Sequence, residues 1–399
     1  MAAPIDRLIV QNDWDEVLRE RNGTAWVTFK SAAPPSVHGE LRNHGVSSIG
    51  VPYIVTGDGF SVDNVSRKTM TVSYKREDDT ILTRKFVAPV ITFSTVHQPK
   101  KGVQCVDVTP GGLGVSCDTA GNLRVWQTDN GEIRRELQGH VGDVYTCRFF
   151  PSGIVLMSAG ADMQIKIWSA ETGKDAATIT GHRAAILDTA VVERGRNIVS
   201  CSRDGTARLW DVGQQVCLHT WADVGGELNC CALAATDNSV QLGTPDAAPS
   251  DREILTEGKM MLLGSELGSL FGFGLHSRDK IFEMNCKSAV NCCTFLSDVQ
   301  VACGTQNGEI IITDLRNTSS PLCHWKESRS AVLSLLPYKQ GLFVSTGDGS
   351  LFYINEEYKT MVELTGSDCD PVYKIACDQT HIYGSCRDGA IRKYNLAHL

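Results

Sequence analysis

Histidine, serine and aspartate recur in this sequence at a spacing that could support nucleophilic catalysis. One set is His182, Ser200 and Asp204, and a second set with the same spacing begins at His140. A serine whose proton passes to a histidine that an aspartate orients is the arrangement of many hydrolytic active sites. The first question is therefore whether these residues attack a substrate or support the fold.

A tryptophan accompanies each set and favours a structural use. The complete sets are His140, Ser158, Asp162 and Trp168, followed 42 positions later by His182, Ser200, Asp204 and Trp210. In the predicted relay the indole N–H bonds the serine, the serine bonds the histidine, and the other histidine nitrogen bonds the aspartate. A serine tied to tryptophan is not open to a substrate, whereas a satisfied buried polar network rigidifies a fold. The set also occurs twice, so we predict a structural relay, no catalytic residues and no enzymatic activity.

The elements that position these residues are short strands around tight turns. Residues 198–202 are β-branched and alternating, 203–205 (Arg-Asp-Gly) suit a turn, and 206–210 return as a strand that ends at Trp210. Gly181-His182 lies 28 residues before Trp210, and Gly139-His140 lies 28 residues before Trp168. A Gly-His opening and a Trp-Asp close around a hairpin are typical of a WD-repeat blade.

The repeat continues along the chain and predicts a propeller. Tryptophans 126, 168 and 210 are 42 residues apart, which suits four-stranded blades. The first blade carries Ala120 at the turn, where the next two carry aspartate. Later turns at Asn307-Gly308, Asp348-Gly349 and Asp388-Gly389 bring the predicted number of blades to seven.

The resulting fold prediction is an all-β chain with two parts. Residues 1–80 do not fit the repeat and are expected to form a small β-rich N-terminal domain, while 84–399 form a seven-bladed WD-repeat β-propeller. Residues 84–95 are an apolar run that we expect to close the last blade, because an unpaired edge strand invites aggregation. Residues 234–258 are expected to be a polar insertion in blade four.

Composition excludes several classes of function. The net charge of −8 argues against a nucleic-acid surface, which needs clustered Lys and Arg. We find neither a signal peptide nor an apolar run long enough for a membrane span. The 15 cysteines include no C-x-x-C pair, so we expect reduced thiols and neither a metal nor a cofactor. The predicted location is the cytoplasm, with the nucleus as a second compartment.

A binding surface is expected on one rim of the ring. Each blade should expose the start of its inner strand and the residue before the turn aspartate on one face. The residues at these positions are Asp143, Tyr145, Leu187, Arg203, Glu227, Asn229, Asn291, Tyr373 and Arg387. Because Tyr and Arg are enriched at the energetic anchors of interfaces, we predict that this set binds a protein partner.

Four segments resemble one particular WD-repeat family. They are residues 147–153 (CRFFPSG), 186–211 (ILDTAVVERGRNIVSCSRDGTARLWD), 291–296 (NCCTFL) and 364–374 (LTGSDCDPVYK). On these segments the chain is similar to the proteasomal ATPase-associated factor 1 family, and the layout of an extra N-terminal domain and seven blades also matches.

The resemblance implies a function that the residue pattern alone does not. It implies a non-enzymatic assembly chaperone, a monomer on its own, that binds the C-terminal domain of an AAA-ATPase subunit in the base of the 19S regulatory particle. It also implies that the chaperone restrains premature association with the 20S core. The alternative is a substrate-recruiting scaffold of a ubiquitin ligase, which would need an adaptor-binding motif. A propeller enzyme would need convergent acids or a metal at the central channel.

Overall fold

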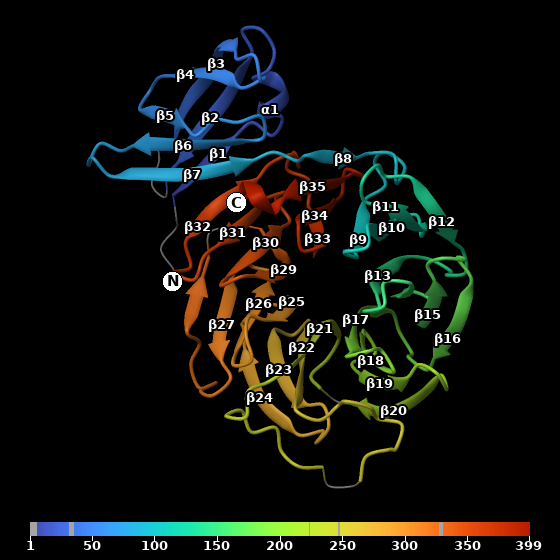
Figure 1. Cartoon of the computed structure of the whole chain (residues 1–399). Helices are drawn as coiled ribbons and strands as arrows, with labels where there is room; N and C mark the ends of the chain where they lie inside the picture. Colours follow the sequence, from blue (N-terminus) through green and yellow to red (C-terminus); the bar gives the residue numbers. More distant parts are fainter. Residues whose placement is uncertain (1–5, 32–35, 223, 246–247, 327–329) are drawn as a thin grey trace.

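The computed structural model describes residues 6–31, 36–222, 224–245, 248–326 and 330–399. These residues form a ring of β-sheets with a smaller β-rich domain seated on one side of it (Figure 1). The seven radial sheets counted in this part of the chain surround a central channel, which makes the ring a seven-bladed propeller.

The N-terminal domain packs two layers of strands around one core. Its elements are β1 (Arg7–Val10), α1 (Trp14–Val17), β2 (Thr24–Lys30), β3 (Val37–Val46), β4 (Pro52–Thr56), β5 (Phe60–Asp63), β6 (Thr69–Lys75) and β7 (Ile81–Val87). Strands β1–β4 form one sheet, and β5–β7 belong to a second. Both layers contribute to the same buried cluster, which includes Leu8, Trp14, Leu41, Met70 and Phe86.

Each blade contains four antiparallel strands that run outward from the channel. The inner strands are β9 (Val103–Val108), β13 (Val144–Phe149), β17 (Ile186–Val192), β21 (Leu228–Ala235), β25 (Val290–Phe295), β29 (Val332–Tyr338) and β33 (Val372–Cys377). The second strands are β10 (Leu113–Asp118), β14 (Val155–Gly160), β18 (Asn197–Ser202), β22 (Lys259–Ser265), β26 (Gln300–Thr305), β30 (Gly341–Thr346) and β34 (His381–Cys386).

The outer half of each blade follows the same order. The third strands are β11 (Leu123–Gln127), β15 (Gln164–Ser169), β19 (Ala207–Asp211), β23 (Ser269–Gly274), β27 (Ile310–Asp314), β31 (Leu351–Ile354) and β35 (Ile391–Asn395). The outer strands are β12 (Ile133–Leu137), β16 (Asp175–Thr180), β20 (Val216–Trp221), β24 (Lys280–Asn285), β28 (Cys323–Trp325), β32 (Thr360–Leu364) and β8 (Ile91–Phe93). A short 3₁₀ helix, η1 (Leu396–His398), follows β35, and the polar insertion lies between β21 and β22, with 246–247 outside the described residues.

Only part of the expected closing strand at 84–95 closes the last blade, because the segment forms parts of two strands in two blades. Strand β8 is the fourth strand of blade seven, where Phe93 lies opposite Ile391 of β35. Strand β7 instead runs parallel to β32 of blade six, with Phe86 opposite Glu363. Pro89 separates the two strands, since proline lacks the N–H that a continuous ladder needs. The chain therefore covers the outer edges of two blades rather than one.

Buried hydrogen bonds join the N-terminal domain to the ring. Trp14 Nε1 donates to Thr365 Oγ1 at 3.0 Å, and Tyr394 in the third strand of blade seven donates its hydroxyl to the Thr365 carbonyl at 2.8 Å. The Thr365 N–H in turn donates to the carbonyl of Val87, at the end of β7. Thr365 thus links the domain to blades six and seven.

Tryptophan relays brace the first three blades. In the second blade Trp168 Nε1 donates to Ser158 Oγ at 2.8 Å, Ser158 lies 2.7 Å from His140 Nε2, and His140 Nδ1 lies 2.8 Å from Asp162. The third blade repeats this order through Trp210, Ser200, His182 and Asp204, with matching distances. Both serines are fully buried, so their hydroxyls are not open to a substrate.

The first blade contains a third relay, where the sequence had indicated only two. Trp126 Nε1 donates to Ser116 Oγ at 3.0 Å, Ser116 lies 2.7 Å from His97 Nε2, and His97 Nδ1 lies 3.0 Å from Asp118. The aspartate comes from the end of the second strand rather than from the turn position of Ala120. The usable signal was Ser116, which precedes its tryptophan by ten residues, as in the other two blades.

Burial and hydrogen bonding determine the protonation states of the histidines and aspartates in the relays. Burial lowers the pKa of His140 and of His182, which keeps both rings neutral at physiological pH. Burial acts to raise the pKa of Asp204, but hydrogen bonds from Thr206 and the Arg183 backbone N–H outweigh it and hold the pKa at about 2. A neutral histidine between a serine and a carboxylate satisfies every donor in the chain.

The closing strand gives a first prediction. Phe93 is buried, and its ring centroid lies 4.9 Å from that of Trp126 in the neighbouring blade. Phe93→Ala should lower the free energy of unfolding by about 3–5 kcal/mol, because it leaves a cavity where the ring closes. Urea or thermal denaturation measures this. Ile81→Ala, at an exposed β7 position, is the control, and equal effects of the two variants would contradict this role of Phe93.

The third relay gives a second prediction. Ser116→Ala leaves the Trp126 N–H and the His97 ring nitrogen buried without their partner, so unfolding should become easier by about 1–3 kcal/mol. Ser158→Ala should cost a similar amount. Ser345→Ala is the matched control, since Ser345 Oγ is buried without a hydrogen-bond partner among the described residues. Similar melting temperatures for the Ser116 and Ser345 variants would show that the relay does not stabilise blade one.

Acid stability gives a third prediction. A carboxyl whose folded pKa is about 2 stabilises the fold above its unfolded pKa of about 3.9, and this contribution disappears as the pH falls to about 2. Asp204→Asn should therefore be less stable than the wild type at pH 7. Its melting temperature should also fall less between pH 4 and pH 2. Parallel curves for the two proteins over that interval would contradict the assignment.

Candidate protein-binding face

One face of the ring is built by the same contact in every blade. We call it the upper face and define it as the side on which the inner strands begin. After each second strand, a backbone N–H bonds a carbonyl just before the inner strand of the same blade. The donor and acceptor pairs are Thr119 and Gly102, Ala161 and Asp143, Arg203 and Ala185, Glu266 and Glu227, Gln306 and Ala289, Gly347 and Ala331, and Arg387 and Pro371. The start of each inner strand and the turn after each second strand therefore share this face.

A β-bulge at the same position in each inner strand shapes the mouth of the channel. The residues skipped by the pairing register are Gln104, Tyr145, Leu187, Asn229, Asn291, Leu333 and Tyr373, which we call the bulge ring. A bulge re-aims the side chain of its extra residue, and all seven residues line the central cavity. Five of them were predicted from the sequence as partner-binding residues, whereas Gln104 and Leu333 were missed.

Three predicted residues meet across neighbouring blades. The guanidinium carbon of Arg203 lies 6.0 Å from the centroid of the Tyr145 ring, and Arg203 Nε lies 3.9 Å from Glu227 Oε2. These side chains come from blades two, three and four. They form a row of mixed charge and aromatic character beside the half-buried Asp143.

Four of the other five predicted residues fall into two groups. Asn229 bonds Glu266 of its own blade and the Val290 carbonyl of the next, and Asn291 bonds Gln306 and the Val332 carbonyl in the same way. Both amides therefore tie adjacent blades together, a structural use that the sequence did not reveal. On blade seven, Arg387 Nε donates to Asp370 Oδ1 at 2.8 Å, and Tyr373 lies beside it at the mouth. Leu187 also lies in the bulge ring, but its apolar side chain cannot form a hydrogen bond of this kind.

Two exposed apolar residues of the upper face were not predicted. Val141 is 81% exposed and Leu267 is 76% exposed, the highest values among the large hydrophobic residues described. The Val141 N–H bonds Asp162, and Leu267 lies in the turn after β22. Leu267 precedes Gly268 just as Asp204 precedes Gly205, so a leucine in place of the turn aspartate was the available signal. Exposed apolar side chains beside acids are suited to protein binding.

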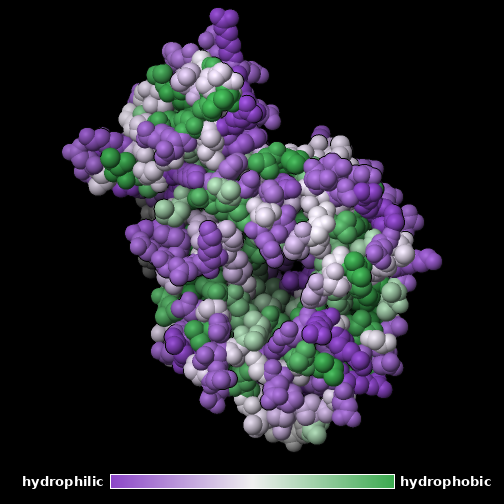
Figure 2. Space-filling model, in the orientation of Figure 1, coloured by the Kyte–Doolittle hydropathy of each residue, from purple (hydrophilic) through white to green (hydrophobic). Residues whose placement is uncertain are grey.

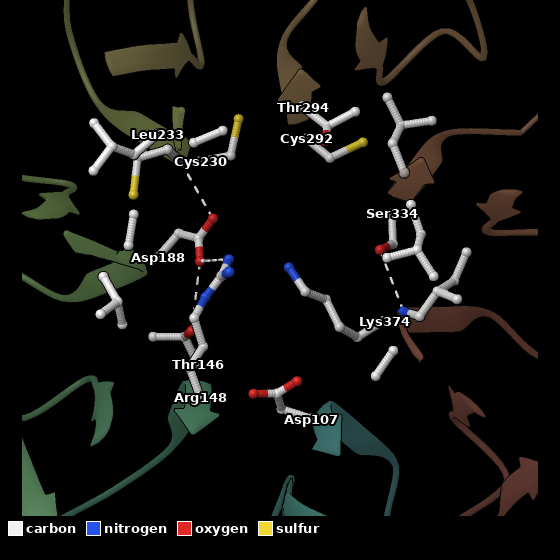
Figure 3. Close-up of a pocket in the computed structure, with 18 of the residues that line it drawn as sticks. Asp107, Thr146, Arg148, Asp188, Cys230, Leu233, Cys292, Thr294, Ser334 and Lys374 are labelled. Atoms are coloured by element: carbon white, nitrogen blue, oxygen red, sulfur yellow. Dashed lines mark hydrogen bonds and ion pairs between the residues drawn. The ribbon is translucent and has the colours of Figure 1, made fainter. Parts of the chain in front are cut away.

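Below the bulge ring the channel is a polar cavity of about 910 Å³. Figure 2 shows the centre of the ring hollowed, and Figure 3 shows the charged side chains that point into it. Asp188 accepts from Arg148 at 3.0 Å and from the Cys231 N–H at 3.3 Å. Asp107 accepts from the Phe149 N–H at 2.7 Å, and burial raises the pKa of Asp107 to about 6. Lys374 extends into the same space (Figure 3).

The described part of the chain lacks two other kinds of feature, a metal cluster and a membrane-spanning helix. We find no group of three or more His, Cys, Asp or Glu side chains that could hold a metal ion there. Among the same residues, no helix has the length and apolar character required to cross a bilayer.

A family model matches two consecutive segments of the ring. The model described as WD domain, G-beta repeat matches residues 131–169 and 173–211. Each match begins at or just before the outer strand of one blade and ends with the third strand of the next, so the sequence repeat is offset from the structural blade. This offset is the reason that the last blade needs a strand from elsewhere.

Comparison with curated proteins reveals similarity along the whole chain. The chain is 48% identical over 393 residues to Proteasomal ATPase-associated factor 1 of Gallus gallus, covering 98% of this chain and 99% of the relative. It is 46% identical over 400 residues to the Homo sapiens protein of that name, with both chains covered in full. It is 32% identical over 240 residues to 26S proteasome regulatory subunit RPN14 of Saccharomyces cerevisiae, covering 57% of each chain. A seven-bladed ring with similarity over its full length shows that this chain belongs to the proteasomal ATPase-associated factor 1 family of WD-repeat proteins.

Proposed function

We propose that the protein is a non-enzymatic assembly chaperone of the proteasome. Its upper face holds the C-terminal domain of an AAA-ATPase subunit from the base of the 19S regulatory particle. While bound, it sterically delays association of that base with the 20S core. The observation that carries the proposal is the full-length similarity to relatives named for association with a proteasomal ATPase.

The architecture of the upper face supports this role. A ring braced by buried relays presents a rigid surface, and rigid surfaces lose little entropy on binding. Asp143 and Glu227 give the face an acidic edge, whereas Val141 and Leu267 offer apolar contact area. This combination suits a folded, positively charged protein domain. The protein acts as a monomer in the cytoplasm, with the nucleus as a second compartment.

Release is part of the proposed cycle. A chaperone that delays a later step must leave once that step is due, so its interface should be of standard or smaller size. Rim charges mainly set the rate of association and its dependence on salt. Binding of the ATPase subunit should accordingly weaken as the ionic strength rises.

Charge reversal on the upper face tests the proposal. Glu227→Lys and Asp143→Lys should each reduce the recovery of proteasomal ATPase subunits with the tagged chain several-fold, because each puts a positive charge where the partner is expected to be basic. Mass spectrometry of the co-purified proteins measures the recovery. The melting temperature should not change.

Glu171→Lys is the matched control, because this exposed acid lies in the turn between β15 and β16, on the opposite face. It should leave recovery unchanged. If all three variants recover the ATPase subunits as the wild type does, the binding surface lies elsewhere. If the wild type recovers no ATPase subunit, the proposed function itself is wrong.

A further inference from the structure

Among the described residues of the channel, Lys374 is a cation whose side-chain donors are unused. Lys374 lies on β33 directly after the bulge residue Tyr373, and its side chain projects into the cavity (Figure 3). Its backbone is held by Ser385, which bonds both its N–H and its carbonyl. Within the described part of the chain, Lys374 Nζ has no hydrogen-bond acceptor and no ion-pair partner. A half-buried ammonium group with three free donors that points into the channel is suited to an anion.

The other charges of the channel already have partners. Arg148 is paired with Asp188, which also accepts from Thr146. Asp107 is bonded to a backbone N–H. Lys259, on the cavity wall, is paired with Glu193. Among the described cations that line the cavity, Lys374 is therefore the one without an ion-pair partner.

A serine hydroxyl on the adjacent blade provides a second hydrogen-bond donor for a carboxylate. Ser334, on β29, takes the third position of its inner strand, as Lys374 does on the adjacent blade. Ser334 is 2% exposed, and its oxygen accepts from the Ile375 N–H at 3.3 Å. Ser334 lines the same cavity, on the same side of the channel as Lys374 (Figure 3), and its hydroxyl retains a proton that a ligand can accept.

We propose that the channel binds a carboxylate of a polypeptide segment, held by Lys374 Nζ and Ser334 Oγ. The segment enters from the upper face through the bulge ring. Its carboxylate belongs to an acidic side chain or to the C-terminus of the partner chain. A carboxylate has one charge and two acceptor oxygens, which match one ammonium and one hydroxyl. A polyphosphate does not fit, because Asp107 and Asp188 line the same space and would repel additional negative charge.

The residues around the mouth of the channel indicate that the bound carboxylate belongs to a polypeptide. The bulge ring supplies Tyr145 and Tyr373 around the opening, and aromatic side chains of this kind anchor protein chains. Exposed Val141 and Leu267 lie on the same face. A free dicarboxylate would use none of these groups. The inference goes beyond the proposed function, because it concerns the chemistry of the bound group and holds for any polypeptide partner.

The test uses the full chain and two neutral-ended peptides, acetyl-Gly-Glu-Gly-amide and acetyl-Gly-Gln-Gly-amide. Saturation-transfer NMR at pH 7 gives the affinity of each peptide. The Glu peptide should bind at least about tenfold more tightly than the Gln peptide, since hydrogen bonds to charged groups discriminate by about that factor. Lys374→Met should abolish this preference, and Lys374→Arg should retain it. Glu171→Lys, on the opposite face, should leave both affinities unchanged.

A second variant tests the same site because it should strengthen peptide binding rather than weaken it. Asp107→Asn keeps the oxygen that accepts from the Phe149 N–H but removes a negative charge from the channel. It should tighten binding of the Glu peptide and leave the Gln peptide unaffected. This gain cannot result from unfolding.

Three outcomes would overturn the proposal. They are equal binding of the two peptides to the wild type, a Glu preference that survives in Lys374→Met, and an Asp107→Asn variant that binds both peptides as the wild type does. Glutarate distinguishes the source of the carboxylate: tighter, Lys374-dependent binding of glutarate than of the Glu peptide would reject the polypeptide source. None of these readouts depends on recovery of an ATPase subunit, so this inference and the proposed function can fail separately.

Discussion

The need to pair every strand edge governs the organisation of this molecule. The sequence repeat starts near the outer strand of one blade and ends within the next, so a simple array would leave the last blade without its outer strand. An open edge in a ring would also leave the first and last blades unsealed. The missing outer strand is β8, which precedes the first blade in the sequence and pairs with β35. Phe93 then fills the space against Trp126 of the first blade.

The same constraint explains where the N-terminal domain sits. Strand β7 pairs in parallel with the outer strand of blade six, so that one continuous sheet runs from the channel into the core of the domain. Trp14 and Thr365 add a buried hydrogen bond across the junction. The domain is therefore part of the closure and is not attached by a free linker. Its position beside blades six and seven also leaves the upper faces of blades two to four, with the row of Tyr145, Arg203 and Glu227, to a partner.

Rigidity and binding capacity arise at different depths of each blade. The tryptophan relays lie inside the first three blades, where Ser116, Ser158 and Ser200 are fully buried and each accepts a hydrogen bond from the tryptophan of its relay. The bulge ring lies at the mouth, where each inner strand carries an extra residue that turns its side chain toward the channel. Bulges are tolerated there because the neighbouring pairs of the ladder remain intact. The side chains at the mouth can therefore vary for function without loss of the blade.

The repeat, the number of blades, two of the three relays and five residues of the bulge ring could all be predicted from the amino-acid sequence. These follow from local pattern, because turn residues, alternation and the spacing of tryptophans act over a few tens of residues. The folded structure was needed to show that 84–95 is split between two blades, that His97 completes a third relay, and that Asn229 and Asn291 tie adjacent blades. It also shows that Lys374 lies across the channel from Asp188 and has no ion-pair partner among the described residues (Figure 3). These facts depend on which strands meet across the ring, and residues as distant as Phe93 and Ile391 become neighbours only when the ring closes.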